Sequence, residues 1–203
     1  MKIFCIGRNY VDHAKELGNV VPKEPLIFMK PPTALLINNK PFYHPDFSEN
    51  IHYECEIVLK IGKNGKNIAE RFAPNYIKEI GLGIDFTARD IQQKLKEKGH
   101  PWEIAKGFNG SAVIGDFVPV EKFENLENIN FHLTKNQEKV QTGNTKDMIF
   151  KFSKLISHLS KYFLIHQGDY IYTGTPAGVG KIEIGDRLEG FLENEKIFHC
   201  NIK

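Results

Sequence analysis

The chain has 203 residues, which suits one domain with a sizeable core, and its 27 Lys and Arg nearly balance its 25 Asp and Glu. The net charge of +2 argues against nucleic acid or an anionic membrane as the main partner. Three scattered cysteines form a poor disulfide framework, and the apolar start at residues 2–6 is too short for a signal peptide. Because no run approaches the ~20 apolar residues that span a bilayer, a reducing cytoplasm is the expected location.

The first elements along the chain are short strands and one short helix. Strands are predicted at residues 2–6 and 26–30, the second ended by two prolines. A helix is predicted over residues 9–17 with Asn9 as its cap, followed by a Gly/Pro-bounded loop over 18–25.

The second part of the chain predicts strands in clusters with three helices between them. A strand over 53–62 is followed by a helix opening near Ala73, a strand over 81–87 and a helix over 88–99. A hairpin is expected over 128–144. The longest predicted helix, 145–165, has apolar residues spaced by three and four at Met148, Phe152, Leu155, Ile156 and Leu159. Three more strands end the chain. Clustered strands exclude a βαβ nucleotide fold and predict one β-rich α+β domain over residues 1–203.

Two acidic residues stand out within the predicted strand at 53–62. Glu54 and Glu56 are two positions apart, so they point to one face of a strand, and Cys55 points to the other. A solvated face would carry such a pair without further consequence. The apolar continuation of the strand instead indicates burial, and buried like charges need a cation. Oxygen ligands favour Mg²⁺, Mn²⁺ or Ca²⁺ over Zn²⁺.

Asp85 supplies a third carboxylate in the apolar segment GLGIDFT. It could cap the helix that follows, although Thr87 is better placed for that role. As a metal ligand it would complete a set of three carboxylates, which leaves about half of an octahedral Mg²⁺ shell for water and substrate.

His13 and Glu16 lie three residues apart on a predicted helix and therefore share a face. Such pairs form surface salt bridges in many proteins. Here they could instead hold and deprotonate a water molecule, because a carboxylate tunes the imidazole. The adjacent loop would let residues 8–25 close over a site as a lid.

Further candidates for substrate contact follow later in the chain. The segment 174–180, GTPAGVG, lacks the spacing of a P-loop, so we expect either a structural turn or a turn whose amides and Thr175 hydroxyl face a ligand carboxylate. Lys106 is either a solvated tail or, beside aromatic residues, a donor to a developing oxyanion. Arg89 and Gln92 lie one helical turn apart just after Asp85, so they either face the same cleft or are ordinary residues of the helix surface.

These pieces together resemble the fumarylacetoacetate hydrolase family, in particular its short single-domain branch that includes acylpyruvate hydrolases. The matching stretches run in the family's order over nearly the whole chain. They are GRNYVDHAKEL (7–17), PLIFMKPPTAL (25–35), HYECEIVLKIGKNGKNI (52–68), GIDFTARDIQQKLKEKGHPWEIAKGFNGSAVIG (83–115), NTKDMIF (144–150) and GDYIYTGTPAGVGKIEIGD (168–186).

The resemblance implies a mixed β-sandwich roll of the fumarylacetoacetase C-terminal-domain type and a homodimer. It places the metal, Mg²⁺ or Mn²⁺, on Glu54, Glu56 and Asp85. The family's lid dyad matches His13 and Glu16, and its active-site lysine matches Lys106. Weaker matches imply substrate contacts from Arg8, Lys30, Arg89, Gln92 and Thr175.

The implied function is a divalent-metal-dependent reaction of a small 2-oxo acid through an enolate. Our main expectation is acylpyruvate hydrolysis: water deprotonated by the His13–Glu16 dyad attacks the distal carbonyl, and pyruvate enolate leaves, held by the metal and Lys106. Oxaloacetate decarboxylase or tautomerase and 2-hydroxyhepta-2,4-diene-1,7-dioate isomerase share that enolate and remain alternatives. A non-catalytic metal-stabilised binding module would need the carboxylates but not the dyad or Lys106.

Overall fold

The computed structural model describes residues 1–16 and 21–203, which form three β-sheets and a few short helices. The largest sheet is mixed, since β1 pairs parallel with β12 and β3 pairs parallel with β8. In spatial order its strands are β2 (Leu26–Lys30), β1 (Ile3–Gly7), β12 (Tyr170–Tyr172), β5 (Cys55–Ile61), β6 (Ile77–Asp85), β8 (Ala112–Ile114) and β3 (Leu35–Leu36), with β9 (Val118–Pro119) also paired to β6.

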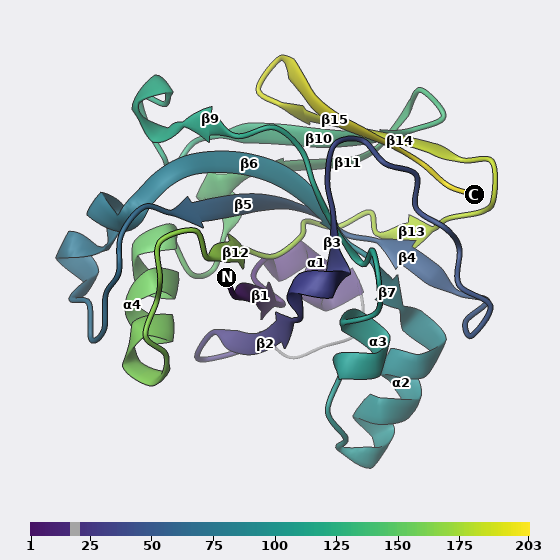
Figure 1. Ribbon diagram of the computed structural model, residues 1–203, viewed down its shortest axis with the longest axis horizontal. Helices are drawn as coiled ribbons and strands as arrows, with labels where there is room; N and C mark the ends of the chain where they lie inside the picture. The colour runs from purple at the N-terminus through teal and green to yellow at the C-terminus, as the bar shows by residue number, and fades with distance from the viewer. Residues whose placement is uncertain (17–20) are drawn as a thin grey trace.

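The other two sheets are antiparallel. One contains, in spatial order, β11 (Glu138–Asn144), β10 (Asn130–Lys135), β14 (Arg187–Leu192) and β15 (Glu195–Asn201); the other contains β13 (Gly180–Lys181), β4 (Ile51–Tyr53) and β7 (Thr87–Ala88). The four-stranded sheet lies over the arched strands β5 and β6 (Figure 1). Side chains from both sheets, including Ile57, Leu82, Phe131 and Leu188, form one buried cluster between the layers. The predicted β-rich α+β roll is thus confirmed.

The strands β5 and β6 are buried on both faces, which explains why their sequences are nearly continuously apolar. A second buried cluster, which includes Cys5, Val58 and Tyr172, fills the other face of the large sheet. All three cysteines are buried and free. The first residues of β5 and the last residues of β6 therefore hold Glu56 and Asp85 deep inside the protein.

The helices lie below the arched strands β5 and β6 in Figure 1, and α4 contributes Phe152, Leu155, Ile156 and Leu159 to the buried cluster between the sheets. They are α1 (Val11–Glu16), α2 (Arg89–Lys98), α3 (Glu103–Lys106) and α4 (Phe152–Tyr162). The helix α2 ends as predicted at Gly99, whose left-handed φ of 65° suits glycine.

Three predicted elements differ from the structure. The prediction of a helix that opens near Ala73 is wrong. Ala73 lies inside a 3₁₀ helix, Glu70–Tyr76, and β6 begins directly after it at Ile77. The helix expected over 145–165 is shorter, because the Asn144 side chain caps a separate 3₁₀ turn at Thr145–Asp147 and α4 starts only at Phe152. Asn9 does not cap α1; its side chain bonds to Phe150 and Thr173.

Candidate metal centre and adjoining pocket

Three carboxylates converge at the end of the central strands. In the β5–β6 ladder Cys55 faces Ile84 and Glu56 faces Gly83, and the amide of Asp85 donates to the carbonyl of Glu54 at 2.8 Å. This register brings carboxylate oxygens of Glu54, Glu56 and Asp85 within 4.8 Å of one another. All three residues are at most 5% exposed. The antiparallel pairing thus joins two acidic segments that lie 30 residues apart in the sequence.

Three cations contact two of these carboxylates. The Lys106 Nζ lies 2.8 Å from Glu54 Oε2 and 2.7 Å from Asp85 Oδ2. The Lys30 Nζ lies 2.7 Å from Asp85 Oδ1, and Arg89 donates to Glu54 Oε1 at 2.6 Å. Glu56 forms no ion pair within the described part of the chain; it accepts a hydrogen bond from the amide of Gly174 at 2.6 Å.

The ionisation of this cluster follows from burial and charge. Burial would raise the pKa of Glu54, but the positive charges of Lys106 and Arg89 outweigh it and hold the pKa well below the ordinary value. Burial and the negative charges of Asp85 and Glu54 raise the pKa of Glu56. Burial opposes the charge on Lys106, yet the two acids raise its pKa, so it stays protonated. The protein's own cations therefore leave one carboxylate without a counter-charge.

The donor set fits a hard divalent cation. Although Lys30 is close to Asp85 Oδ1, that oxygen accepts no well-directed hydrogen bond from the described residues. A cation beside it would use this free oxygen and would also keep Glu56 ionised. Carboxylate oxygens alone, without His or Cys, match Mg²⁺ or Mn²⁺. The alternative role of Asp85 as a helix cap is not observed, and neither is a cap at Thr87, because Ala88 is the N-cap of α2.

The predicted dyad lies on α1, beside this cluster. The His13 Nδ1 and Glu16 Oε2 are 3.5 Å apart, and His13 is buried while a third of the Glu16 side chain is exposed. Burial lowers the pKa of His13 and outweighs the acids Glu54 and Glu16, which raise it. His13 is therefore neutral at pH 7 and able to accept a proton. The expected lid over 8–25 includes residues 17–20, which lie outside the described residues.

The segment 174–180 binds the protein's own carboxylates. The amide of Gly174 donates to Glu56, and the amide of Gly178 donates to Glu16 Oε1 at 3.1 Å. The bonds of these two amides fit the structural turn that the sequence left open, and contact of the segment with a ligand carboxylate stays a prediction. Gly174 has a φ of 100°, and a Cβ there would lie 2.6 Å from the Cβ of Asn9, so only glycine fits. The turn thus joins the metal centre to α1.

Sequence reasoning missed Gln141, which holds the same turn from β11. Its Oε1 accepts from the Cys55 amide at 2.9 Å, and its Nε2 donates to Thr175 Oγ1 at 2.9 Å and to the Pro176 carbonyl at 3.0 Å. Thr175 in turn donates to the Cys55 carbonyl at 2.9 Å. Both backbone groups of the residue between the two glutamates are therefore fixed. A lone glutamine in a hairpin strand carries no sequence signal of this role.

A pocket opens beside the carboxylates and collects most of the predicted residues. Its lining comprises Gly7, Arg8, His13, Phe28, Glu54, Arg89, Gln92, Lys96, Trp102 and Lys106. Lys30 and Thr175 lie outside this lining: Lys30 is buried behind Asp85 against the carbonyls of Phe86, Lys106 and Ser111, and the Thr175 hydroxyl is used in the Gln141 network. Their direct contact with substrate stays a prediction. Phe28, Lys96 and Trp102 are additions that only the structure reveals.

The fold and this site define a known class of protein. The model of the fumarylacetoacetate (FAA) hydrolase C-terminal family matches residues 2–201, so the chain belongs to that family.

Individual members are similar over nearly their whole length. The mouse (Mus musculus) protein "Oxaloacetate tautomerase FAHD1, mitochondrial" is 41% identical over 99% of this chain and 91% of its own. The Escherichia coli (strain K12) "Oxaloacetate tautomerase YcgM" is 40% identical over 92% of this chain and 86% of its own. The crystal structure of fumarylpyruvate hydrolase from Pseudomonas aeruginosa, in complex with Mn²⁺ and pyruvate, superposes with a TM-score of 0.94 at 33% identity, over 100% of this chain and 89% of that one.

In the described ranges, 1–16 and 21–203, no helix has the length and apolar character needed to cross a membrane.

Proposed function

We propose that this protein is a Mg²⁺- or Mn²⁺-dependent enzyme that interconverts the keto and enol forms of oxaloacetate. The observation that carries the proposal is the set of three buried carboxylates within 4.8 Å, with protonated Lys106 against two of them and neutral His13 in the same pocket. Two relatives at about 40% identity that carry the name oxaloacetate tautomerase support this choice over the acylpyruvate hydrolysis expected first.

Glu54, Glu56 and Asp85 would hold the metal, which when bound supplies Lewis-acid polarisation of the 2-oxo group. The Mn²⁺ in the similar fumarylpyruvate hydrolase structure supports a divalent ion of this kind. Ca²⁺ would also accept these oxygen ligands.

The chain's own residues divide the remaining work of the reaction. Tautomerisation moves one proton between C3 and the 2-oxo oxygen, so it needs a base near C3 and a donor near the oxygen. His13 is neutral and takes the C3 proton, while Glu16 orients the ring and stabilises its charged form. The 2-oxo oxygen then gains one proton and His13 releases one, both by exchange with solvent, so that His13 returns to its neutral form. Lys106 remains protonated and donates a hydrogen bond to the negative charge that develops on the oxygen.

Acylpyruvate hydrolysis is the second candidate, because a similar structure is that of a fumarylpyruvate hydrolase. In that reaction the His13–Glu16 dyad would deprotonate a water molecule rather than C3. Oxaloacetate decarboxylation and isomerisation of 2-hydroxyhepta-2,4-diene-1,7-dioate would use the same charge stabilisation. A non-catalytic binding module would leave neutral His13 in the pocket without a role.

One set of assays separates these reactions. Decay of the ultraviolet absorbance of enol-oxaloacetate is followed with the purified protein and Mg²⁺, Mn²⁺ or EDTA, while a lactate dehydrogenase couple records pyruvate from oxaloacetate or acetylpyruvate. We expect metal-dependent acceleration of enol decay that exceeds pyruvate release. Faster pyruvate release from acetylpyruvate would support the hydrolase instead, and no acceleration of any reaction with metal bound would support the binding module.

A homodimer and a cytoplasmic location are part of the same proposal. Light scattering on the eluted protein would measure the oligomeric state.

A further inference from the structure

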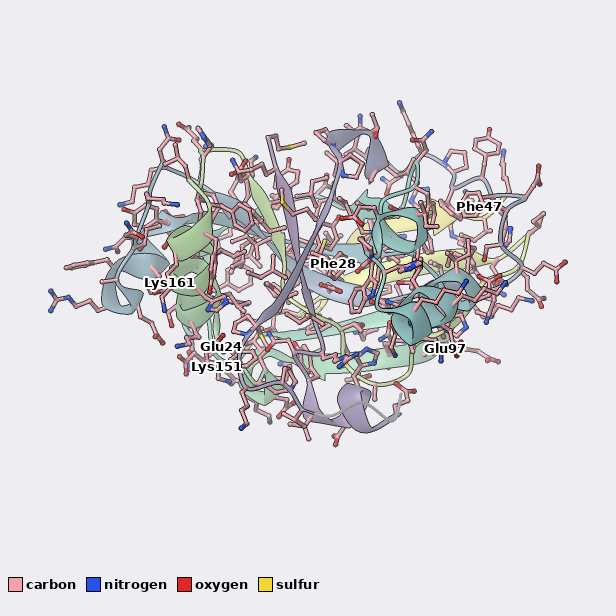
Figure 2. The ribbon with its side chains drawn as sticks, turned by 90° about the horizontal axis from the view of Figure 1, so that it is seen from below. Glu24, Phe28, Phe47, Glu97, Lys151 and Lys161 are labelled. Atoms are coloured by element: carbon pink, nitrogen blue, oxygen red, sulfur yellow. The ribbon has the colours of Figure 1, made fainter. Side chains whose placement is uncertain are left out.

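Lys30 and Lys106 contact the same carboxylate through its two different oxygens. The Lys106 Nζ lies beside Asp85 Oδ2 and its side chain lines the pocket, whereas the Lys30 Nζ lies beside Asp85 Oδ1 and its side chain has no exposed surface. Lys30 is the last residue of β2, and Figure 2 labels Phe28, two residues before it on the same strand. Fully buried lysines are rare, so the contacts of Lys30 indicate what it does.

The ammonium group of Lys30 has three N–H donors and five oxygen neighbours. Besides Asp85 Oδ1 at 2.7 Å, the neighbours are the carbonyl of Phe86 at 3.2 Å, the carbonyl of Lys106, and the carbonyl and hydroxyl of Ser111 at 3.1 and 3.0 Å. The protein itself therefore uses every donor, and none is left for a substrate. Lys30 can act on the reaction only through the groups that it holds.

These groups belong to two segments that meet at the metal centre. Asp85 ends β6 and Phe86 follows it, while Lys106 ends α3 and Ser111 directly precedes β8. The Phe86 amide donates to the Ser111 carbonyl at 2.8 Å, and the Ser111 hydroxyl donates to the Lys106 carbonyl at 2.7 Å. Lys30 thus lies where the strand that carries a metal-site carboxylate meets the helix that carries the pocket lysine.

The packing between β2 and α3 is close as well as polar. A Cβ on Gly107 would lie 3.1 Å from the Cδ of Pro31 and 3.0 Å from the carbonyl oxygen of Glu103. The residue that follows β2 therefore packs directly against the end of α3, which has only four residues. A helix this short leaves its last carbonyls without helical partners, and the Lys30 ammonium satisfies the carbonyl of Lys106.

We propose that Lys30 is a positioning residue for the reaction: together with Ser111 it holds the Lys106 segment against Asp85, so that the Lys106 ammonium stays directed at the metal end. This role replaces the substrate contact expected from the sequence, which a buried ammonium with no free donor does not offer. An ammonium suits the role because it can bond a carboxylate and several backbone oxygens at once. The inference rests on the proposed function, in which Lys106 donates to the developing charge.

Two variants and two matched controls test this role. Lys30→Met removes the ammonium but keeps an unbranched side chain, and Ser111→Ala removes only the hydroxyl. The control Lys60→Met removes another lysine of the large sheet, which pairs with Glu79 at 2.7 Å outside the pocket. The control Ser160→Ala removes another buried hydroxyl with two hydrogen bonds, also outside the pocket. Urea denaturation of each metal-free protein establishes that it folds.

The measurements separate the reaction from ligand and metal binding. The values of kcat and KM are determined for enol-oxaloacetate with saturating Mg²⁺. Oxalate, which resembles the 2-oxo acid group, is titrated into the Mg²⁺-loaded protein, and its binding is followed by the fluorescence of Trp102, the one tryptophan of the sequence, which lines the pocket. Mn²⁺ is titrated into the metal-free protein.

We expect Lys30→Met to lower kcat by about 100-fold, because a displacement of the donor by about 1 Å is enough for such a loss. KM and oxalate affinity should stay at the wild-type values. Mn²⁺ affinity should fall by about tenfold, as for other outer partners of metal ligands. Ser111→Ala should lower kcat by about tenfold, as for loss of one hydrogen bond to a charged group, and both controls should match wild type.

Three results would overturn the proposal. A higher KM or weaker oxalate binding, in step with kcat, would make Lys30 a substrate contact. Lower stability with an unchanged kcat would make its role structural, and tighter Mn²⁺ binding would make it only a charge that competes with the metal. If Lys30→Met does not fold, the kcat and KM of Ser111→Ala decide by the same criteria.

The proposed function can fail separately from the role of Lys30. If wild type with Mg²⁺ does not accelerate enol decay, the proposed function is refuted. Equal Mn²⁺ affinity of wild type and Lys30→Met would then also refute the support of Asp85 by Lys30, whereas a tenfold loss would retain it.

Discussion

The two sides of the pocket are built by different means. At the metal end, strand register and buried ion pairs fix Glu54, Glu56 and Asp85, and every residue there is nearly inaccessible. On the α1 side, a helix of six residues carries His13 and Glu16, which lie 3.5 Å apart within the helix, and the amide of Gly178 bonds to Glu16 from outside it. The metal end is thus a preformed charge cluster, while the acid–base side depends on a few exposed contacts and is easier to perturb without loss of the fold.

The largest effect is expected from Asp85→Asn, which removes one charge from the rigid side. Metal affinity should fall by more than about 100-fold, beyond the loss typical of an outer-sphere partner. The metal-free protein should also lose about 3 kcal/mol of unfolding free energy, because Lys30 and Lys106 lose a buried partner. Mn²⁺ titration and urea denaturation measure the two effects, with exposed Asp116→Asn as the control. Unchanged Mn²⁺ affinity would remove Asp85 from the metal site.

Glu16→Gln tests the other side of the comparison. We expect kcat for enol-oxaloacetate to fall by about 100-fold, because the neutral amide no longer stabilises charged His13. Mn²⁺ affinity and unfolding free energy should stay close to wild type, since Glu16 is partly exposed and lies outside the carboxylate cluster. An unchanged kcat would refute the role of the dyad, and a parallel loss of Mn²⁺ would show that the two sides are not independent.

Gln141→Leu probes the link between the two sides. The Cys55 amide and the Pro176 carbonyl lose their buried partner, so the unfolding free energy should fall by about 2 kcal/mol. Mn²⁺ affinity should fall by roughly tenfold, as for other outer partners of metal ligands. Gln167→Leu at an exposed position is the control. If stability falls while Mn²⁺ affinity does not, Gln141 supports the fold without orienting the glutamates.

The smallest effect concerns pH. Burial lowers the pKa of His13, so the neutral base persists below the ordinary value of 6.5 and kcat should fall only as the pH drops through this lowered pKa. Because Glu16 raises the pKa of His13, its replacement by Gln should move the acid limb to still lower pH. The residual kcat of Glu16→Gln against pH measures this displacement. An acid limb that moves to higher pH would mean that a group other than His13 controls the profile.

Local patterns in the sequence were sufficient for much of the fold and for the composition of the site. The apolar runs predicted the central strands. Because Glu54 and Glu56 stand beside such a run, they predicted a buried acidic site from the sequence alone. The end of α2 at Gly99 was also predicted correctly, because the left-handed backbone conformation there depends on that single residue. Where competing local signals met, as at Ala73 and in 145–165, the prediction was wrong because sheet pairing and the Asn144 cap outweigh helix propensity.

The tertiary structure alone determined which of these residues contact one another. Only strand register brings Asp85 beside Glu54. Only tertiary packing buries Lys30 against Asp85 while Lys106 lines the pocket. The role of Gln141 depends on contacts between segments far apart in the chain, which no local pattern records. The sequence by itself was sufficient to predict a cluster of buried acidic residues, which the structure contains. The three-dimensional arrangement determined which of these charges pair with one another, as Lys106 does with Glu54 and Asp85.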